Sequence, residues 1–245
     1  MNKDEVINKL KNTLLENEIE PTQDILDKYN KYYEYLIEYN KNVNLTSITS
    51  YEDVYIKHFV DSIINCKMYK KNATVCDIGT GAGFPGLALK IARPDLKVFL
   101  VDSLNKRIKF LQNVVDAFEI KDALCLHFRA EDVEFKQKFL NTFDYVISRA
   151  VASMPILTEY CLPFVKVGGQ FIAYKSSDCE NELNDAHKCI NLLGGGNINI
   201  IAINITKEID RKLICISKIS ETSSKYPRGQ NKPRIAPIKW LIILH

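Results

Sequence analysis

The apolar residues of this chain change period near residue 73, and this change constrains the fold more than any other feature. From residue 73 onward, short strand-like runs alternate with stretches of helical spacing. The strand-like runs cover residues 73–78, 98–102, 123–128, 145–147 and 170–175, and the helical stretches cover residues 87–92, 108–118, 153–165 and 180–193. Strands that alternate with helices pair in parallel, so we predict an α/β fold with a mostly parallel, doubly wound sheet. Two further β-like runs, 198–205 and 211–219, close the pattern.

Before residue 70 the apolar residues recur every three or four positions, which predicts helices. Val6, Leu10 and Leu14 follow this spacing. We therefore expect an N-terminal helical cap over residues 1–70, a core over 71–220 and a separate C-terminal segment over 221–245. Eight of the twelve tyrosines lie in the expected cap. A row of tyrosines can stack on bases, but at helical spacing it favours packing in a core.

Composition excludes several classes of protein. The chain has 245 residues, of which 46% are hydrophobic and 26% charged, as in ordinary globular proteins. No apolar run approaches the roughly 20 residues that span a bilayer, and acidic residues stand where a signal peptide would be basic and then apolar. The seven cysteines include no C-x-x-C pair. We therefore expect a cytoplasmic protein with buried thiols and neither a membrane anchor nor a metal site.

A glycine-rich turn is the sharpest local signal. Asp77–Gly86 reads DIGTGAGFPG and lies between an expected strand and an expected helix, where open α/β sheets bind ligands. Its glycines allow a tight turn and a close approach of the backbone to a ligand. A nucleotide-phosphate loop would continue with lysine after the last glycine, but Leu87 follows here. The turn is therefore not a phosphate loop of that kind.

Two ligands remain open for this turn. The last three glycines have the G-x-G-x-x-G spacing of dinucleotide sites, which keeps an NAD-dependent oxidoreductase as an alternative. S-adenosylmethionine fits better, because the carboxylate of Asp77 suits a ligand with an ammonium and a sulfonium group. Asp102 ends the next expected strand, where it would accept hydrogen bonds from the ribose hydroxyls.

Positive charge is concentrated near the end of the chain. Six basic residues and one acidic residue lie between Lys218 and Lys239, although the net charge of the whole chain is only +3. Such a segment is either a solvated tail or a surface for a polyanion. We predict an RNA clamp in which Arg228, Lys232 and Arg234 contact phosphates. A non-enzymatic RNA-binding protein would share this feature, but it would leave the glycine turn unexplained.

Together with five further motifs, the turn resembles the glucose-inhibited division protein B family, the bacterial 16S ribosomal RNA guanine-N7 methyltransferases. The motifs are NLT at Asn44–Thr46, KHFVDS at Lys57–Ser62, RAED at Arg129–Asp132, SRAVA at Ser148–Ala152, and YPRG at Tyr226–Gly229 with Lys232 and Pro233 after it. The resemblance covers roughly residues 5 to 237. It implies a class I methyltransferase fold with a helical cap, S-adenosylmethionine as cofactor, and a guanine in the decoding-centre loop of the small ribosomal subunit as substrate.

The resemblance also assigns residues to the donor site, and the chain departs from the family at its end. By resemblance, Gly79, Phe84, Ala130, Glu131 and Arg149 bind the donor. Gly81 and Gly83 join them from the turn, and Asp102 joins from the ribose argument. Residues 235–239 replace a more basic finish, and the apolar residues 240–245 run beyond it.

The chemistry of the acceptor gives independent support for guanine N7. Methyltransferases that act on exocyclic amines commonly carry an Asn/Asp-Pro-Pro-Tyr/Phe loop after the fourth strand, whereas Ser148–Val151 stands there in this chain, without a nucleophilic cysteine. N7 has a free lone pair and needs no base. We predict that Arg149 acts in the site, orienting the guanine or contacting the donor, although a structural salt bridge would also explain it.

Four further residues are candidates for RNA contacts. These are Lys57, His58, Lys106 and Arg107, each of which taken alone also suits a solvated charge or, for His58, packing. We expect a monomer that acts on 16S rRNA or on the small subunit. A methyltransferase for another RNA or for a small molecule stays open as an alternative.

Overall fold

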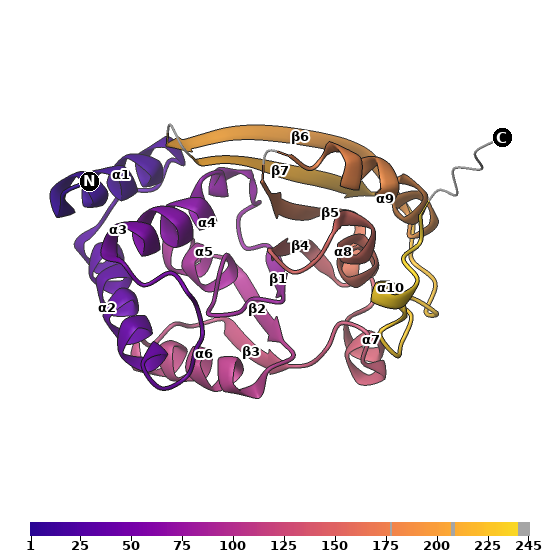
Figure 1. Cartoon of the computed structure of the whole chain (residues 1–245), viewed down its shortest axis with the longest axis horizontal. Helices are drawn as coiled ribbons and strands as arrows, with labels where there is room; N and C mark the ends of the chain where they lie inside the picture. Colours follow the sequence, from indigo (N-terminus) through magenta and orange to yellow (C-terminus); the bar gives the residue numbers. More distant parts are fainter. Residues whose placement is uncertain (177, 207–208, 240–245) are drawn as a thin grey trace. The chain divides into compact units, whose positions relative to one another are not determined.

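The computed structural model describes residues 1–176, 178–206 and 209–239. The chain forms two compact units, Met1–His127 and Phe128–His245 (Figure 1). Across the described ranges, no helix combines the length and the apolar character needed to cross a membrane.

The regular elements before residue 70 are all helices or helical turns, as the sequence predicts. The helical elements are α1 (Lys3–Glu16), α2 (Gln23–Asn40), α3 (Tyr51–Val54), the π-helical turn η1 (Tyr55–Val60), α4 (Asp61–Ile63) and the 3-10 turn η2 (Cys66–Met68). The starts of these helices are encoded locally. Asn2 and Glu5 form a reciprocal capping box on α1, and the side chain of Ser50 accepts a 3.1 Å hydrogen bond from the Asp53 amide at the start of α3.

Three tyrosines of these helices, Tyr29, Tyr32 and Tyr55, belong to the core, which confirms the packing interpretation for them. Tyr29 and Tyr32 on α2 are fully buried, and Phe59 packs between them with ring centroids 4.9 and 5.4 Å away. The hydroxyl groups of Tyr29 and Tyr32 also have polar partners. Tyr29 donates a 2.7 Å hydrogen bond to the Ala88 carbonyl, and Tyr32 donates to the carbonyl of Ala82 in the glycine turn. Helix α2 is thereby fixed to the turn and to the helix that follows it.

Three parallel strands form the sheet of the first unit, in the order β3-β2-β1. The elements are β1 (Thr74–Ile78), α5 (Gly86–Ala92), β2 (Lys97–Asp102), α6 (Asn105–Ala117) and β3 (Ala123–His127). In the register, Ile78 lies beside Val101, and Asp102 lies beside His127. The carboxyl ends of the strands therefore meet at one edge, and this edge carries the glycine turn.

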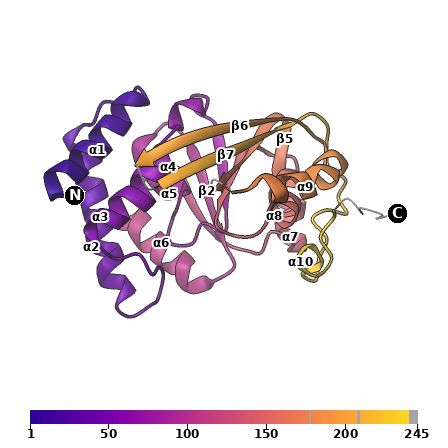
Figure 2. The same ribbon diagram turned by 45° about the horizontal axis from the view of Figure 1, so that its top comes forward.

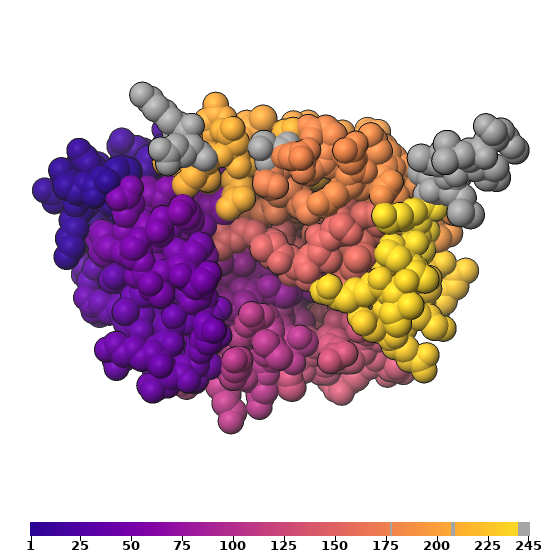
Figure 3. All heavy atoms as spheres, viewed as in Figure 1, coloured from indigo at the N-terminus to yellow at the C-terminus, as the bar shows by residue number. Residues whose placement is uncertain are grey.

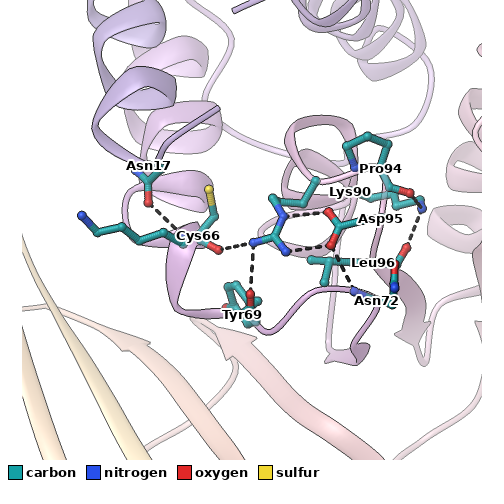
Figure 4. A network of polar contacts seen from close by, with 10 residues as sticks. Asn17, Cys66, Tyr69, Asn72, Lys90, Pro94, Asp95 and Leu96 are labelled. Carbon is teal, nitrogen blue, oxygen red and sulfur yellow. Dashed lines mark hydrogen bonds and ion pairs between the residues drawn. The ribbon is translucent and has the colours of Figure 1, made fainter. Parts of the chain in front are cut away.

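A polar network joins the segment before β1 to the segment before β2 (Figure 4). The guanidinium of Arg93 makes two 2.7 Å bonds to the carboxylate of Asp95, and its Nη1 donates to the carbonyls of Cys66 and Tyr69. Nearby, the buried Lys90 donates to two backbone carbonyls of the α5–β2 connection. These bonds satisfy the cations inside the unit, so Arg93 and Lys90 serve the fold.

The second unit combines parallel and antiparallel strands in the order β4-β5-β7-β6. Its elements are α7 (Val133–Phe139), β4 (Phe143–Arg149), α8 (Met154–Cys161), the 3-10 turn η3 (Leu162–Phe164), β5 (Val165–Lys175), α9 (Glu180–Leu192), β6 (Gly195–Thr206), β7 (Ile209–Lys218) and α10 (Lys232–Ile235). Strands β4 and β5 are parallel, as predicted, whereas β5, β7 and β6 pair antiparallel. Figure 2 shows β6 and β7 as a long hairpin.

One element of this unit was missed, and one expectation was wrong. The helix α7 was not anticipated, and β5 begins at Val165 instead of after the glycine pair at 168–169. The pair lies inside the strand, next to a register shift between Phe143 and Tyr145 of β4. A side chain at Gly169 would clash with the Asp144 carbonyl, so glycine permits this irregular pairing and does not end the strand.

The described part of the C-terminal segment is docked on the second unit, as Figure 3 shows in yellow. Thr222, Tyr226, Pro227 and Pro233 are buried. Thr222 also exchanges two hydrogen bonds with the side chain of Asn141, at 3.0 and 3.3 Å. The segment is therefore part of the folded unit up to residue 239, while residues 240–245 lie outside the described residues.

Candidate functional site

The glycine turn is held tightly at the carboxyl ends of β1 and β2. The amides of Gly79 and Thr80 donate to the Val101 carbonyl at 2.8 and 3.1 Å. The amides of Gly83 and Phe84 both donate to the Thr80 carbonyl at 2.9 Å. The turn is thus bonded to β2 and closed on itself over Thr80–Phe84.

Asp77 closes the turn from inside. Its carboxylate is fully buried, and its Oδ2 accepts a 2.7 Å hydrogen bond from the Gly86 amide at the start of α5. This geometry replaces the interpretation that Asp77 faces a cationic ligand. The acid is needed because it satisfies a backbone donor at the N-terminus of a helix.

The glycines of the turn have different surroundings. Gly81 and Gly83 both have positive φ, +61° and +99°. A methyl group at Gly81 would meet no heavy atom within 4 Å, so the backbone there is open to a ligand. A methyl group at Gly83 would clash with the Tyr32 hydroxyl and lie within 2.9 Å of Leu111 and Leu87. Packing against α2 and α6 therefore suffices to explain Gly83.

Asp102 connects the open glycine to helix α6. Its Oδ2 accepts hydrogen bonds from the Gly81 amide at 3.0 Å and from Arg107 Nη1 at 3.2 Å, and its Oδ1 accepts one from the Leu104 amide at 2.9 Å. A carboxylate offers about four lone-pair sites. Among the described contacts, Oδ1 accepts only the bond from the Leu104 amide, so it keeps one acceptor site that could serve a ribose hydroxyl.

Phe84 and His58 join the cap motifs to the turn. Their rings stack with centroids 4.2 Å apart and planes 11° apart, and His58 Nε2 lies 3.2 Å from the Thr46 hydroxyl. His58 is buried. The packing interpretation therefore fits His58, and the NLT and KHFVDS motifs meet at the turn.

The other basic candidates of the first unit differ in whether they form ion pairs within the protein. Lys57 forms a 2.6 Å ion pair with Asp53, and the hydrogen bond from Lys57 lowers the pKa of the Asp53 carboxyl. Arg107 is held by Asp102. Lys106 is exposed at the start of α6.

The second unit holds the remaining donor-site candidates. Ala130 is buried and Glu131 half-buried between β3 and α7. Arg149 is the last residue of β4, where it lies beside Tyr174 of β5 and is half-buried. The structure therefore brings Gly79, Gly81, Phe84 and Asp102 together in the first unit, and it places Arg149 at the end of a parallel strand.

The basic C-terminal segment carries less free charge than its sequence suggests. Lys218 is 1% exposed, and its Nζ donates to the Leu162 carbonyl and the Thr222 hydroxyl at 2.7 and 2.6 Å. Burial lowers the pKa of Lys218 to about 7. Lys239 pairs with Asp185 at 2.8 Å. Lys218 therefore adds nothing to an exposed basic surface, and the charge of the exposed Lys239 is balanced by a neighbouring acid.

Arg228 is also held by the protein itself. Its backbone amide and Nε donate to Glu159 Oε1 at 2.9 and 2.8 Å, and its Nη2 donates to Oε2 at 2.7 Å. The hydrogen bonds that Arg228 donates to Glu159 raise the pKa of Arg228, and Glu159 is completely buried. Arg228 is therefore a structural residue and not the free phosphate contact that we predicted, because its guanidinium neutralises a buried carboxylate.

Sequence reasoning missed Glu159 and the burial of Lys218. A signal for Glu159 was present, since it is the one acid in α8, whose other residues are mostly apolar. A buried acid requires a partner, but its partner lies 69 residues later. Within the described residues, no group of three or more His, Cys, Asp or Glu is arranged to hold a metal ion.

The chain is similar to known methyltransferases over most of its length. Residues 25–214 match the family described as GidB, rRNA small subunit methyltransferase G. The ribosomal RNA small subunit methyltransferase G of Lachnoclostridium phytofermentans is 47% identical over 216 residues, which cover 87% of this chain and 89% of that protein. Its counterpart in Desulforamulus reducens is 44% identical over 232 residues, which cover 94% of this chain and 97% of that protein.

Solved structures agree with the fold. TYW2 of M. jannaschii, solved in complex with AdoMet, matches with a TM-score of 0.50 at 14% identity, covering 63% of this chain and 73% of that one. The expected mostly parallel class I methyltransferase fold is confirmed. On the extent of the family match and the identity to its members, this chain belongs to the GidB family, the rRNA small subunit methyltransferases G.

Proposed function

We propose that this protein transfers a methyl group from S-adenosylmethionine to N7 of a guanine in the decoding-centre loop of 16S rRNA, acting as a cytoplasmic monomer. The family membership supports S-adenosylmethionine-dependent methylation of rRNA. The observation that carries the donor site is the open face of Gly81, whose amide is tied to a carboxylate with an acceptor site to spare. An NAD-dependent oxidoreductase has no comparable support from the relatives.

The residues of the donor site divide the task of holding the ligand. Asp102 would accept a hydrogen bond from a ribose hydroxyl, and the backbone at Gly79 and Gly81 would approach the ligand closely. Phe84 is fixed for this role by its stack on His58. The family resemblance assigns Ala130, Glu131 and Arg149 to the same ligand, and we retain them in the proposal. When bound, S-adenosylmethionine supplies a methyl group on a sulfonium that leaves as a neutral thioether.

The chemistry at guanine N7 asks little of the protein beyond orientation. The N7 lone pair attacks the methyl carbon in line, and no proton leaves N7 during attack, so no general base is required. The N7 and O6 edge of guanine consists of acceptors, which a guanidinium can bind with two N–H groups. Arg149, at the end of β4, is the arginine that we propose for this role or for contact with the donor.

Exposed basic residues would bind the phosphates of the RNA. Lys106, Lys232 and Arg234 are exposed. Lys57 is half-buried and pairs with Asp53, and an RNA phosphate can take the place of that carboxylate as its partner. Each lost phosphate contact reduces the slope of log affinity against log salt by about 0.7–0.9. Arg107, Arg228 and His58 are engaged within the protein, so we give them supporting roles.

The test is methyl transfer to small ribosomal subunits from a strain that lacks this gene. We expect incorporation of one labelled methyl group per subunit and a modified base that maps as N7-methylguanine in the decoding-centre loop. Methylation of another RNA, or of small molecules only, would refute the substrate. Calorimetric binding of NAD in place of S-adenosylmethionine would refute the enzyme class.

A further inference from the structure

The loop that follows Arg149 has a conformation that its sequence does not favour. Ala150 has a φ of +57°, in the left-handed region that non-glycine residues rarely adopt. Such a conformation is strained and persists only where its surroundings hold it. Residues 150–153, which we name the β4 loop, separate Arg149 from helix α8. Their contacts therefore decide how Arg149 is presented.

One brace on the β4 loop comes from β5 and α9. Lys175 and Glu182 form a 2.6 Å ion pair. Lys175 Nζ also donates to the Ala152 carbonyl at 3.3 Å, and Glu182 Oε2 accepts a 3.0 Å bond from the Met154 amide. Both charges of the pair thus bond to the backbone at the end of the loop.

A second brace comes from the C-terminal segment. Arg234 of α10 donates from Nη2 to the Val151 carbonyl at 3.3 Å, and its guanidinium lies 5.9 Å from the centroid of the Tyr160 ring. The Tyr160 hydroxyl in turn lies 3.4 Å from Asn231 Oδ1. Arg234 therefore spans from the segment to the loop, supported by a cation–π contact.

The segment that carries Arg234 is itself anchored. Arg228 bonds to the buried Glu159 with three hydrogen bonds and donates from Nη2 to the Ala236 carbonyl at 2.8 Å. Arg228 and Ala236 therefore close the segment on both sides of Arg234. A fixed support of this kind orders a neighbouring loop, which a freely moving tail could not do.

We propose that Arg234 is a positioning residue, which holds the β4 loop so that Arg149 meets the guanine in the geometry of methyl transfer. The C-terminal segment then acts on the transfer step as well as on RNA affinity. This inference rests on the proposed function, because it assigns the acceptor to the end of β4.

The test compares Arg234→Lys and Arg234→Ala with Lys232→Ala, a matched control on the same short helix. Lysine at 234 keeps the charge but loses the planar group that reaches both the Tyr160 ring and the Val151 carbonyl. We expect Arg234→Lys to lower kcat on small subunits about tenfold, with little change in the KM for the subunit or in its salt dependence. Arg234→Ala should lower kcat at least as much and also raise KM. Lys232→Ala should raise KM and weaken the salt dependence while kcat stays within twofold.

Each alternative result overturns one specific claim. Wild-type kcat in Arg234→Lys, together with equal KM effects in the two alanine variants, would make Arg234 a simple phosphate contact and refute positioning. The affinity for S-adenosylmethionine, measured by calorimetry, should stay unchanged in all three variants. Failure of the wild-type enzyme to methylate small subunits would instead refute the proposed function.

Discussion

Two glycines of the same turn are required for different physical reasons, and this difference can be measured. Gly83→Ala places a methyl group against the Tyr32 hydroxyl and Leu111, so we expect a loss of about 2–4 kcal/mol in the free energy of unfolding. Gly81→Ala meets no neighbouring atom and should cost only about 1–2 kcal/mol through its positive φ. Urea denaturation of the two variants measures both changes.

The same pair separates packing from ligand binding. Gly81→Ala should weaken the binding of S-adenosylmethionine more than its modest effect on stability explains. Calorimetry on folded protein at low temperature provides that comparison. Wild-type affinity in Gly81→Ala would remove the open glycine from the donor site.

Asp102 is the residue for which the site predicts the largest single effect on donor affinity. Asp102→Ala removes a charged acceptor, which costs about 1.5–3 kcal/mol for one hydrogen bond, or roughly 10- to 150-fold in affinity. It also leaves the Gly81 and Leu104 amides without their acceptor, so stability should fall as well. Asp116→Ala, which removes an exposed acid from the following helix α6, should change neither quantity. An unchanged Kd for the donor in Asp102→Ala would show that this carboxylate serves the turn alone.

At the scale of elements, the anchor between α8 and the C-terminal segment is the contact with the largest expected energy. Arg228→Ala strands the fully buried Glu159, which costs about 3–5 kcal/mol for a broken buried pair. Removing both partners avoids the stranded charge, so the Glu159→Gln and Arg228→Met double variant should be more stable than Arg228→Ala alone. Denaturation of the wild type, Glu159→Gln, Arg228→Met and the double variant gives the coupling free energy. Additive effects would show that the two side chains do not depend on each other.

The sequence predicted those elements whose signals are local. The strands β1 to β3 and the helix α6 lie within a few residues of their expected positions, because each is a single apolar run or stripe bounded by polar residues. Helix α7 was missed because seven residues with Phe135 and Phe139 hardly establish a helical period. The start of β5 was misplaced because glycine 169, which makes room for a carbonyl on the neighbouring strand, has the same sequence signature as a turn.

In the candidate site, too, the features with local signals were predicted and those that depend on distant residues were not. The glycine turn could be recognised because its residues and its strand–helix context lie within about ten positions. The roles of Arg228 and Lys218 could not, because the groups that engage them, Glu159 and Leu162, lie more than 50 residues away. Counting charges along the chain therefore overestimated the basic surface, because the sequence does not distinguish a buried lysine from an exposed one.

For the molecule as a whole, the burial of charge links stability to pH. The nearly balanced composition, with a net charge of +3, leaves little general electrostatic repulsion, so individual buried groups dominate this linkage. Six of the seven cysteines are buried, as expected, and burial raises the pKa of Cys66 to about 12 and of Cys215 to about 11. Such thiols keep their protons in the folded state, so they make the protein less stable above about pH 8.5, where unfolded thiols ionise.

Lys218 acts in the opposite direction, and this gives the last prediction. Its pKa is lowered to about 7 by burial, whereas lysine in an unfolded chain titrates near 10.4. Between these two values the unfolded state binds one more proton than the folded state, so the contribution of Lys218 to stability improves as pH rises from 7 to 10. Below pH 7 both states are protonated, and the full penalty of the buried charge is constant. The slope approaches about 1.4 kcal/mol per pH unit where a whole proton separates the states.

Lys218→Met removes this titration and leaves the thiols in place. The difference in the free energy of unfolding between wild type and variant, measured by urea denaturation under reducing conditions from pH 6.0 to 9.5, therefore isolates the lysine. We expect that difference to be flat near pH 6 and to shift in favour of the wild type above pH 7, while Lys188→Met, which changes an exposed lysine on α9, should show no such trend. A difference that stays flat through pH 9.5 would show that Lys218 keeps its proton in the folded protein, where its bonds to the Leu162 carbonyl and the Thr222 hydroxyl would then compensate fully for burial.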